Sequence, residues 1–307
     1  MTAMAVDYGK LPTERPNPRS HHLDRLRPSQ LVDLILAEDE RAARAVRRVK
    51  GPITRGVSWV AASLGEGGRL IYAGAGSSGR LAALDAAECV PTFGTDPGQV
   101  VAVIAGGPRA LLMAVEGAED RTQKASAALG RLRVGRRDIV CAISASGVTP
   151  FALAALRAAK QRGARTILLT CAPRPEHRRL ADLIIGPRVG PEVLAGSTRM
   201  KAGLATQMIL HTLTTGAMVR LGKVHQNRMV DLKPASRKLR ARAIRIVGDL
   251  TGKGPRAASE LLKKAGGRPT VALVMNRLRI SRVQAESLLS RHKGPLHRLL
   301  EPSRRGR

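Results

Sequence analysis

The sequence has 307 residues and a formal net charge of +30; 43% of its residues are hydrophobic, but only 2% are aromatic. This length suits an α/β domain with a smaller second domain, and the core must consist mainly of Ala, Val, Leu and Ile. No apolar run approaches the roughly 20 residues of a membrane span, and the polar, Pro-rich start lacks a secretory apolar segment, so we expect a cytoplasmic protein without a membrane partner.

The first 50 residues are expected to form an arm followed by a helix. Four prolines between residues 10 and 28 prevent a continuous helix in the arm. Apolar residues then recur at helical spacing from Pro28 to Arg48, and a second helix is expected from about Pro52 to Leu64.

Residues 51–225 have the alternating pattern of a parallel sheet that helices cover on both faces. Short, mostly apolar segments predict strands at Arg69–Ala73, Val100–Ala105, Asp138–Ser144, Thr166–Thr170 and Leu183–Ile185. Helices are expected to begin near Ser78, Pro108, Thr149, Pro175 and Ser197. The predicted fold class is therefore α/β, a doubly wound parallel sheet with N-terminal helices and a small C-terminal helical domain.

The strand pattern stops after Pro234, and residues 237–303 are expected to form the small helical domain. This region is strongly basic, because residues 235–307 contain 19 Lys and Arg but only 4 Asp and Glu, a net charge of +15. Basic surfaces can bind nucleic acid by neutralising phosphates. Nucleic-acid readers commonly stack bases on aromatic side chains, however, and this segment has none. We therefore favour a solvated helical surface over a nucleic-acid partner.

A glycine- and serine-rich loop, Gly74–Gly79, follows the first expected strand. Its glycines match the G-x-G-x-x-G pattern of dinucleotide-binding folds. The next strand, however, ends in Gly106–Gly107, where such a fold would place a ribose-binding acid. Serine hydroxyls and backbone N–H groups at a helix N-terminus instead suit a single phosphate, with Gly76, Ser77 and Ser78 as ligands.

A second loop of this kind follows the third expected strand and contributes Ser144, Ser146 and Thr149. These three side chains have an alternative interpretation, in which they only cap the helix that starts at Pro150. Two such loops at the carboxyl ends of parallel strands favour a shared monophosphate site, because ligands of open α/β sheets bind there.

Together with these loops, six further sequence blocks resemble a known family. They are Thr13–Ser20, Leu84–Gly94, Ile104–Gly107, Ala114–Asp120, Gly196–Gly203 and Asn227–Asp231. Over nearly the whole chain, the sequence resembles the sugar isomerase domain superfamily and, within it, the N-acetylmuramic acid 6-phosphate etherases. Animal glucokinase regulatory proteins share the same blocks. The resemblance implies a phosphorylated amino sugar as substrate, no cofactor or metal, a homodimer whose active site draws on both subunits, and a C-terminal domain similar to ubiquitin-associated domains.

The reaction that the resemblance implies removes lactate from C3 of the sugar. It needs a base at C2 and an acid at the ether oxygen, and two carboxyl groups can supply both. The resemblance implies that Glu88 is the proton donor and Glu119 the second catalytic glutamate. The apolar segment around Glu88 predicts a buried, protonated carboxyl group, and Glu119 is expected on a helix. Arg199 and Lys201 are candidates for binding the phosphate or the lactyl carboxylate.

Five residues depart from the family pattern near these motifs and leave the exact sugar open. Val148 stands in place of Arg and Phe151 in place of Tyr, while Leu204, Thr206 and Gln207 stand in place of Thr, Gln and Lys. A non-catalytic phosphosugar sensor is the main alternative function, although it would need the serine loops and neither carboxyl group. A sugar-phosphate isomerase is less favoured, because the histidines show no useful placement near the loops.

Overall fold

The computed structural model describes residues 7, 9, 11–232, 234, 236–292 and 294–300, so residues 301–303 of the expected helical domain lie outside the described part. The chain separates into two compact units. The first comprises Met1–Ala86 and Gly98–Leu213, and the second Ala87–Pro97 and Thr214–Arg307. The domain limits expected from the sequence stay a prediction. No helix in the described part is long and apolar enough to cross a membrane.

A five-stranded parallel sheet forms the centre of the first unit, as the sequence predicts. The strands are β1 (Leu70–Gly74), β2 (Val100–Ile104), β3 (Ile139–Ile143), β4 (Arg165–Leu169) and β5 (Leu183–Ile185), in the order β2-β1-β3-β4-β5. The chain passes from β1 to β2 on one side and then to β3 on the other, so the strand order reverses between β1 and β3. In open α/β sheets, this switch point is where ligands bind.

The α-helices that start in the described part of the first unit are α1 (Pro28–Arg48), α2 (Lys50–Gly65), α3 (Gly76–Phe93), α4 (Arg109–Leu112), α5 (Thr122–Arg131), α6 (Pro150–Gln161), α7 (His177–Leu180) and α8 (Lys201–Arg220). Both α3 and α8 continue into the second unit.

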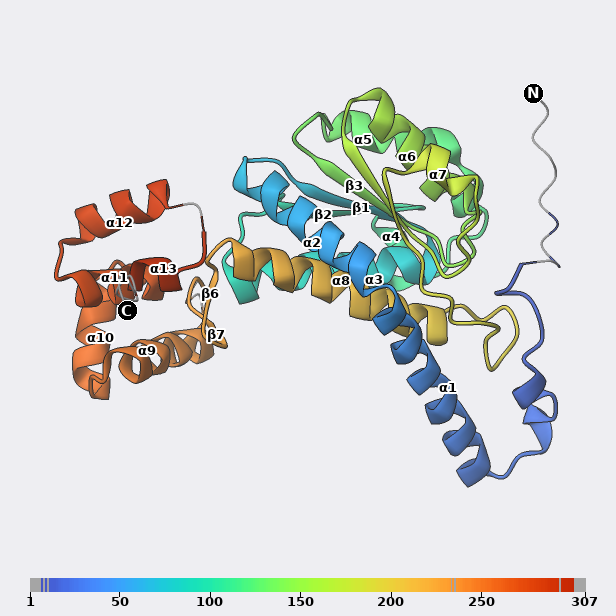
Figure 1. The fold of residues 1–307 in the computed structure, drawn as a ribbon, viewed down its shortest axis with the longest axis horizontal. Helices are drawn as coiled ribbons and strands as arrows, with labels where there is room; N and C mark the ends of the chain where they lie inside the picture. The colour runs from blue at the N-terminus through green and yellow to red at the C-terminus, as the bar shows by residue number, and fades with distance from the viewer. Residues whose placement is uncertain are drawn as a thin grey trace, which may run out of the picture. The chain divides into compact units, whose positions relative to one another are not determined.

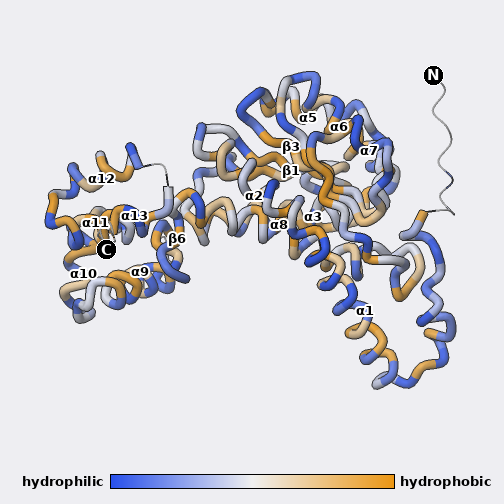
Figure 2. The backbone as a smooth tube through the Cα atoms, viewed as in Figure 1, coloured by the Kyte–Doolittle hydropathy of each residue, from blue (hydrophilic) through white to orange (hydrophobic). Residues whose placement is uncertain are grey.

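Helices cover both faces of the sheet, with α5 and α6 on one face and α2 and α3 on the other (Figure 1). Successive side chains of a strand point to opposite faces. Ile71 and Ala73 accordingly join the core beneath α5 and α6, whereas Tyr72 donates a hydrogen bond of 2.9 Å to Asp85 on α3. The strands β1 and β3 are therefore buried throughout, and they stand out as apolar stretches in Figure 2.

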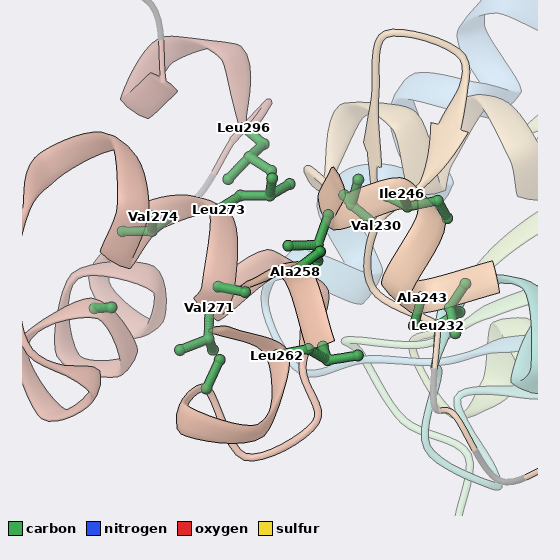
Figure 3. Close-up of a cluster of buried hydrophobic side chains, with 14 residues drawn as sticks. Val230, Leu232, Ala243, Ile246, Ala258, Leu262, Val271, Leu273, Val274 and Leu296 are labelled. Atoms are coloured by element: carbon green, nitrogen blue, oxygen red, sulfur yellow. The ribbon is translucent and has the colours of Figure 1, made fainter. Parts of the chain in front are cut away.

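The second unit is mainly helical. It contains the antiparallel strands β6 (Val224–His225) and β7 (Arg228–Met229), and the helices α9 (Arg237–Thr251), α10 (Pro255–Lys264), α11 (Pro269–Leu278), α12 (Arg282–Arg291) and α13 (His297–Leu300). Their apolar faces enclose a core that includes Ile246, Leu262 and Val271 (Figure 3). Serine side chains cap two of the helices, since Ser236 accepts from Leu239 N and Ser281 from Gln284 N.

Candidate active site

A cavity of about 330 Å³ in the first unit brings the two serine-rich loops together. One loop follows β1 and the other follows β3, and these strands are neighbours in the sheet. Five of the expected phosphate ligands line the cavity: Gly76, Ser77, Ser78, Ser146 and Thr149. The cavity therefore lies at the switch point of the sheet, where the sequence predicts a phosphate site. The binding of phosphate by these residues stays a prediction.

The first loop places helix α3 with its N-terminus at the cavity. Because α3 begins at Gly76, directly after β1, its first N–H groups have no partner within the helix and carry the positive end of the helix dipole. Ser77 and Ser78 add two half-buried hydroxyl groups to this end. Among the described residues that line the cavity, Arg80 has the cationic side chain. Its guanidinium donates a hydrogen bond to the Met113 carbonyl at 2.9 Å. This arrangement suits an anion.

Ser144 organises the second loop from within and does not line the cavity. It is buried, its Oγ lies 2.8 Å from Thr149 Oγ1, and it accepts hydrogen bonds from Gly147 N (3.0 Å) and Thr149 N (3.3 Å). The expected contact of Ser144 with the phosphate stays a prediction. Ser146 and Thr149 are half-buried and do reach the cavity.

His177 supports the second loop from behind, a role for which its sequence context offers no signal. Its Nδ1 accepts from Arg174 N (3.2 Å), so Nε2 carries the proton and donates to the Gly147 carbonyl at 3.0 Å. Gly147 has a φ of +75°, and a Cβ there would lie 2.6 Å from the imidazole. Burial, together with the charge of Arg174, lowers the pKa of His177, which keeps the ring neutral in this pattern of hydrogen bonds.

Three carboxylates line the same cavity: Glu119, Glu116 and Glu14. The sequence predicts Glu119 on a helix that starts near Pro108, but α4 ends at Leu112, and Glu119 lies on a single 3-10 turn, Ala118–Asp120. The helix ends because Met113 adopts an extended backbone, and Gly117, with a left-handed φ of +67°, then leads into the turn. This turn nevertheless directs Glu119 into the cavity, as its expected role requires.

Glu88 is placed differently from the expectation. It lies on α3 beyond Ala86, in the part of the helix that belongs to the second unit, and does not line the cavity of the first unit. Its side chain is exposed, so the prediction of a buried carboxyl group is wrong for the single chain. Helical periodicity explains this: Asp85 and Cys89 occupy the buried face of α3, whereas Leu84 and Glu88, four residues apart, share the exposed face.

Lys201 is buried and pairs with Glu38 of α1. Asn17 donates to the same carboxylate oxygen at 2.9 Å. Its ammonium group is held in the interior, and Lys201 does not line the cavity, so its binding of an anionic group of the substrate stays a prediction. The backbone N–H groups of Lys201 and Ala202 both donate to Glu192 at 2.9 Å, which fixes the start of α8.

Arg199 is exposed and lines an adjoining cavity of about 500 Å³. Ser77 and Arg80 line both cavities, so the two hollows meet at the first serine loop. Leu204 and Gln207, two of the departures from the family pattern, also line this second cavity. Arg199 thus remains placed to meet an anionic group near the phosphate site.

Three further features of the described residues contrast with this site. A cavity of about 570 Å³ along β2 has neither hydroxyl nor carboxyl side chains in its lining. No group of three or more His, Cys, Asp or Glu in the described part is arranged to hold a metal ion. Burial raises the pKa of both Cys141 and Cys171 to about 12, so these thiols stay protonated.

Known proteins resemble this chain over nearly its full length. The N-acetylmuramic acid 6-phosphate etherase of Crocosphaera subtropica is 45% identical over 295 residues, covering 96% of this chain and 97% of its own. The chain belongs to the N-acetylmuramic acid 6-phosphate etherase family. The etherase of Thermosynechococcus vestitus is 48% identical over 87% of both chains, and that of Edwardsiella ictaluri 47% identical over 95% of this chain and 97% of its own.

Two family models match parts of this etherase family member. Residues 53–160 match the glucokinase regulatory protein N-terminal SIS domain, and residues 121–216 match the SIS domain. Among solved structures, the phosphoheptose isomerase of Neisseria gonorrhoeae is similar, with a TM-score of 0.49 and 19% identity over 62% of this chain and 98% of its own.

Proposed function

We propose that this protein is a carbon–oxygen lyase that converts N-acetylmuramic acid 6-phosphate and water into N-acetylglucosamine 6-phosphate and D-lactate, in the recycling of cell-wall amino sugars. One observation carries the proposal: a single cavity joins two serine-rich loops to Glu119. Its volume, about 330 Å³, falls within the usual range for small-molecule sites. The near full-length similarity to etherases supports the same reaction.

The phosphate is bound by neutral donors in this proposal. Ser77, Ser78, Ser146 and Thr149 supply hydroxyl groups, and the start of α3 supplies N–H groups. Val148 is buried and adds no cation to the second loop. The helix dipole and Arg80 therefore provide the positive potential that a phosphate dianion requires.

The two glutamates divide the acid and base work. In the open-chain sugar, the C1 aldehyde acidifies the C2 proton, which Glu119 removes as general base. Glu88 protonates the ether oxygen as the C3–O bond breaks, which releases lactate and leaves a C2–C3 double bond. Water then adds across this bond, with its hydroxyl at C3 and a proton at C2. We assign the protein to the cytoplasm and propose that it acts as a homodimer whose active site draws on both subunits.

The lactyl carboxylate is assigned to the adjoining cavity, where Arg199 lies beside Ser77 and Arg80. This assignment gives the departures from the family pattern a physical meaning. Leu204 and Gln207 line this cavity and do not line the cavity formed by the two serine-rich loops. We therefore expect them to alter the recognition of the substituent at C3 more than that of the phosphate.

Lactate release from N-acetylmuramic acid 6-phosphate by the purified protein tests the proposal. In deuterated water, solvent deuterium should enter C2 of the product, because the C2 proton is removed and replaced during the reaction. The match to the glucokinase regulatory protein model favours a non-catalytic phosphosugar sensor as the second candidate. Tight binding of N-acetylglucosamine 6-phosphate without any lactate release would reject the lyase and support the sensor.

A further inference from the structure

The N-terminal arm brings a carboxylate into the cavity to which the proposed reaction gives no role. Glu14 lines the cavity together with residues of both serine loops and Glu119, although it lies far from them in the sequence. A side chain on a Pro-rich surface arm would ordinarily be free in solvent. Its presence in the lining therefore requires that the arm be held in place.

The arm is fastened on both sides of Glu14. On one side, the Thr13 carbonyl accepts a hydrogen bond from Gly196 N at 3.1 Å. On the other, the side chain of Asn17 donates to the Pro191 carbonyl (3.3 Å) and to Glu38 (2.9 Å). Both Thr13 and Asn17 are buried. Buried polar groups with satisfied hydrogen bonds fix a loop more firmly than exposed ones, because breaking them leaves unpaired donors and acceptors.

Gly196 leaves room for the carboxylate. Its φ is +77°, a conformation that favours glycine, and a Cβ at this position would lie 2.9 Å from Glu14 Oε2. Thr13 Oγ1 donates to the other oxygen, Glu14 Oε1, at 3.2 Å. The blocks Thr13–Ser20 and Gly196–Gly203, separate in the sequence, thus meet at one carboxylate beside the cavity.

We infer that Glu14 is a substrate-binding residue whose carboxylate accepts hydrogen bonds from the sugar hydroxyl groups. Since a carboxylate repels a phosphate, Glu14 contacts the sugar portion of the ligand while the serine loops hold the phosphate. Gly196 and Asn17 are positioning residues, which act through Glu14. The inference rests on the proposed function in one respect only, that the ligand is a phosphosugar.

Calorimetric titration with N-acetylglucosamine 6-phosphate and, separately, with inorganic phosphate tests this inference. Glu14→Gln should bind the phosphosugar about 10- to 100-fold more weakly, the effect of losing a hydrogen bond to a charged group, and should bind inorganic phosphate as the wild type does. Glu40→Gln, which changes an exposed glutamate on α1, is the matched control and should leave both affinities unchanged. Phosphosugar affinity of Glu14→Gln within twofold of the wild type would overturn the inference.

Gly196→Ala tests the positioning part independently. It should weaken phosphosugar binding because its methyl group displaces the carboxylate, and the double variant with Glu14→Gln should bind no more weakly than Glu14→Gln alone. Additive losses would show that Gly196 does not act through Glu14. These titrations measure binding and need no turnover. If phosphosugar binding depends on Glu14 but the protein releases no lactate, only the lyase proposal is rejected. If the wild type binds no phosphosugar, both proposals are rejected.

Discussion

Glu119 and Asp120 are adjacent residues on the same exposed turn, yet only Glu119 lines the cavity. The pair therefore offers a matched comparison. Glu119→Gln should lower kcat by about 100-fold or more, the usual contribution of a general base, while N-acetylglucosamine 6-phosphate still binds. Asp120→Asn should retain wild-type kinetics. Steady-state lactate release and phosphosugar titration measure both effects, and an equal loss in the two variants would contradict a catalytic role for Glu119.

His177 makes stability depend on pH. Because its pKa is lowered from 6.5 by burial, the unfolded chain binds a proton below pH 6.5 that the folded chain does not. The free energy of unfolding should therefore be highest above this pH and decline as the pH falls through and below it. Urea unfolding at pH 7.5 and 5.5 should show a smaller decline for His177→Gln than for the wild type.

The exposed His297 provides the control for this titration. His297→Gln should keep the full pH dependence of the wild type, because it removes an exposed histidine and leaves the contacts of His177 intact. If His177→Gln and His297→Gln retained the same pH slope, another group would be responsible for the decline. Since His177 supports Gly147, we also expect the affinity for inorganic phosphate to fall in His177→Gln.

At the scale of elements, the sequence predicts those helices and strands whose positions depend on residues close by in the chain. The prolines and the apolar periodicity locate α1 at Pro28–Arg48, as observed. The helix expected from near Pro108 instead ends at Leu112, where the backbone of Met113 becomes extended, and the left-handed Gly117 then starts the turn that carries Glu119. A single residue does not reveal its backbone conformation in the sequence, so this early end was not predictable.

The same limit applies to the site. The serine loops are local features at strand ends, and the sequence predicts their placement. Lys201 lies in a predicted motif as well, but its side chain is directed to the interior by Glu38, a partner distant in the chain. Ser144 is turned inward within its own loop, where it contacts Thr149, and the sequence does not separate this arrangement from a phosphate ligand. Glu14 enters the cavity only through hydrogen bonds between distant segments, which no local pattern contains.

The buried pair between Lys201 and Glu38 connects α8 with α1 in the first unit. Burial by itself raises the pKa of Glu38, but hydrogen bonds from Lys201 and Asn17 hold this pKa below its usual value. Lys201→Met should thus destabilise the protein by about 3–5 kcal/mol, because it removes the buried ammonium partner of this carboxylate and leaves it with Asn17 and the more exposed Arg19 and Arg41. Chemical denaturation measures the loss. Arg44→Met, which breaks the exposed pair with Glu40, should cost less than about 1 kcal/mol, and similar losses would refute the argument.

At the scale of the whole molecule, half of the net charge of +30 lies in residues 235–307. The core of the second unit consists of apolar side chains such as Ile246, Leu262 and Val271. The basic residues of α9 are largely exposed, among them Lys238 and Arg245. This distribution agrees with a solvated basic surface over an apolar helical core, and nucleic-acid binding remains the weaker interpretation.

The proposed homodimer and the shared active site can be tested together by mixing two inactive variants. Symmetric dimers present equivalent sites, so a site built from Glu88 of one subunit and Glu119 of the other is intact once in every mixed dimer of Glu88→Gln and Glu119→Gln. After unfolding and refolding of equal amounts together, lactate release should recover to about a quarter of the wild-type rate, because about half of the dimers are mixed and each has one working site. Each variant refolded alone stays inactive and is the control. If both glutamates of a site come from the same subunit, the mixture also stays inactive, and a monomer by sedimentation would reject the homodimer itself.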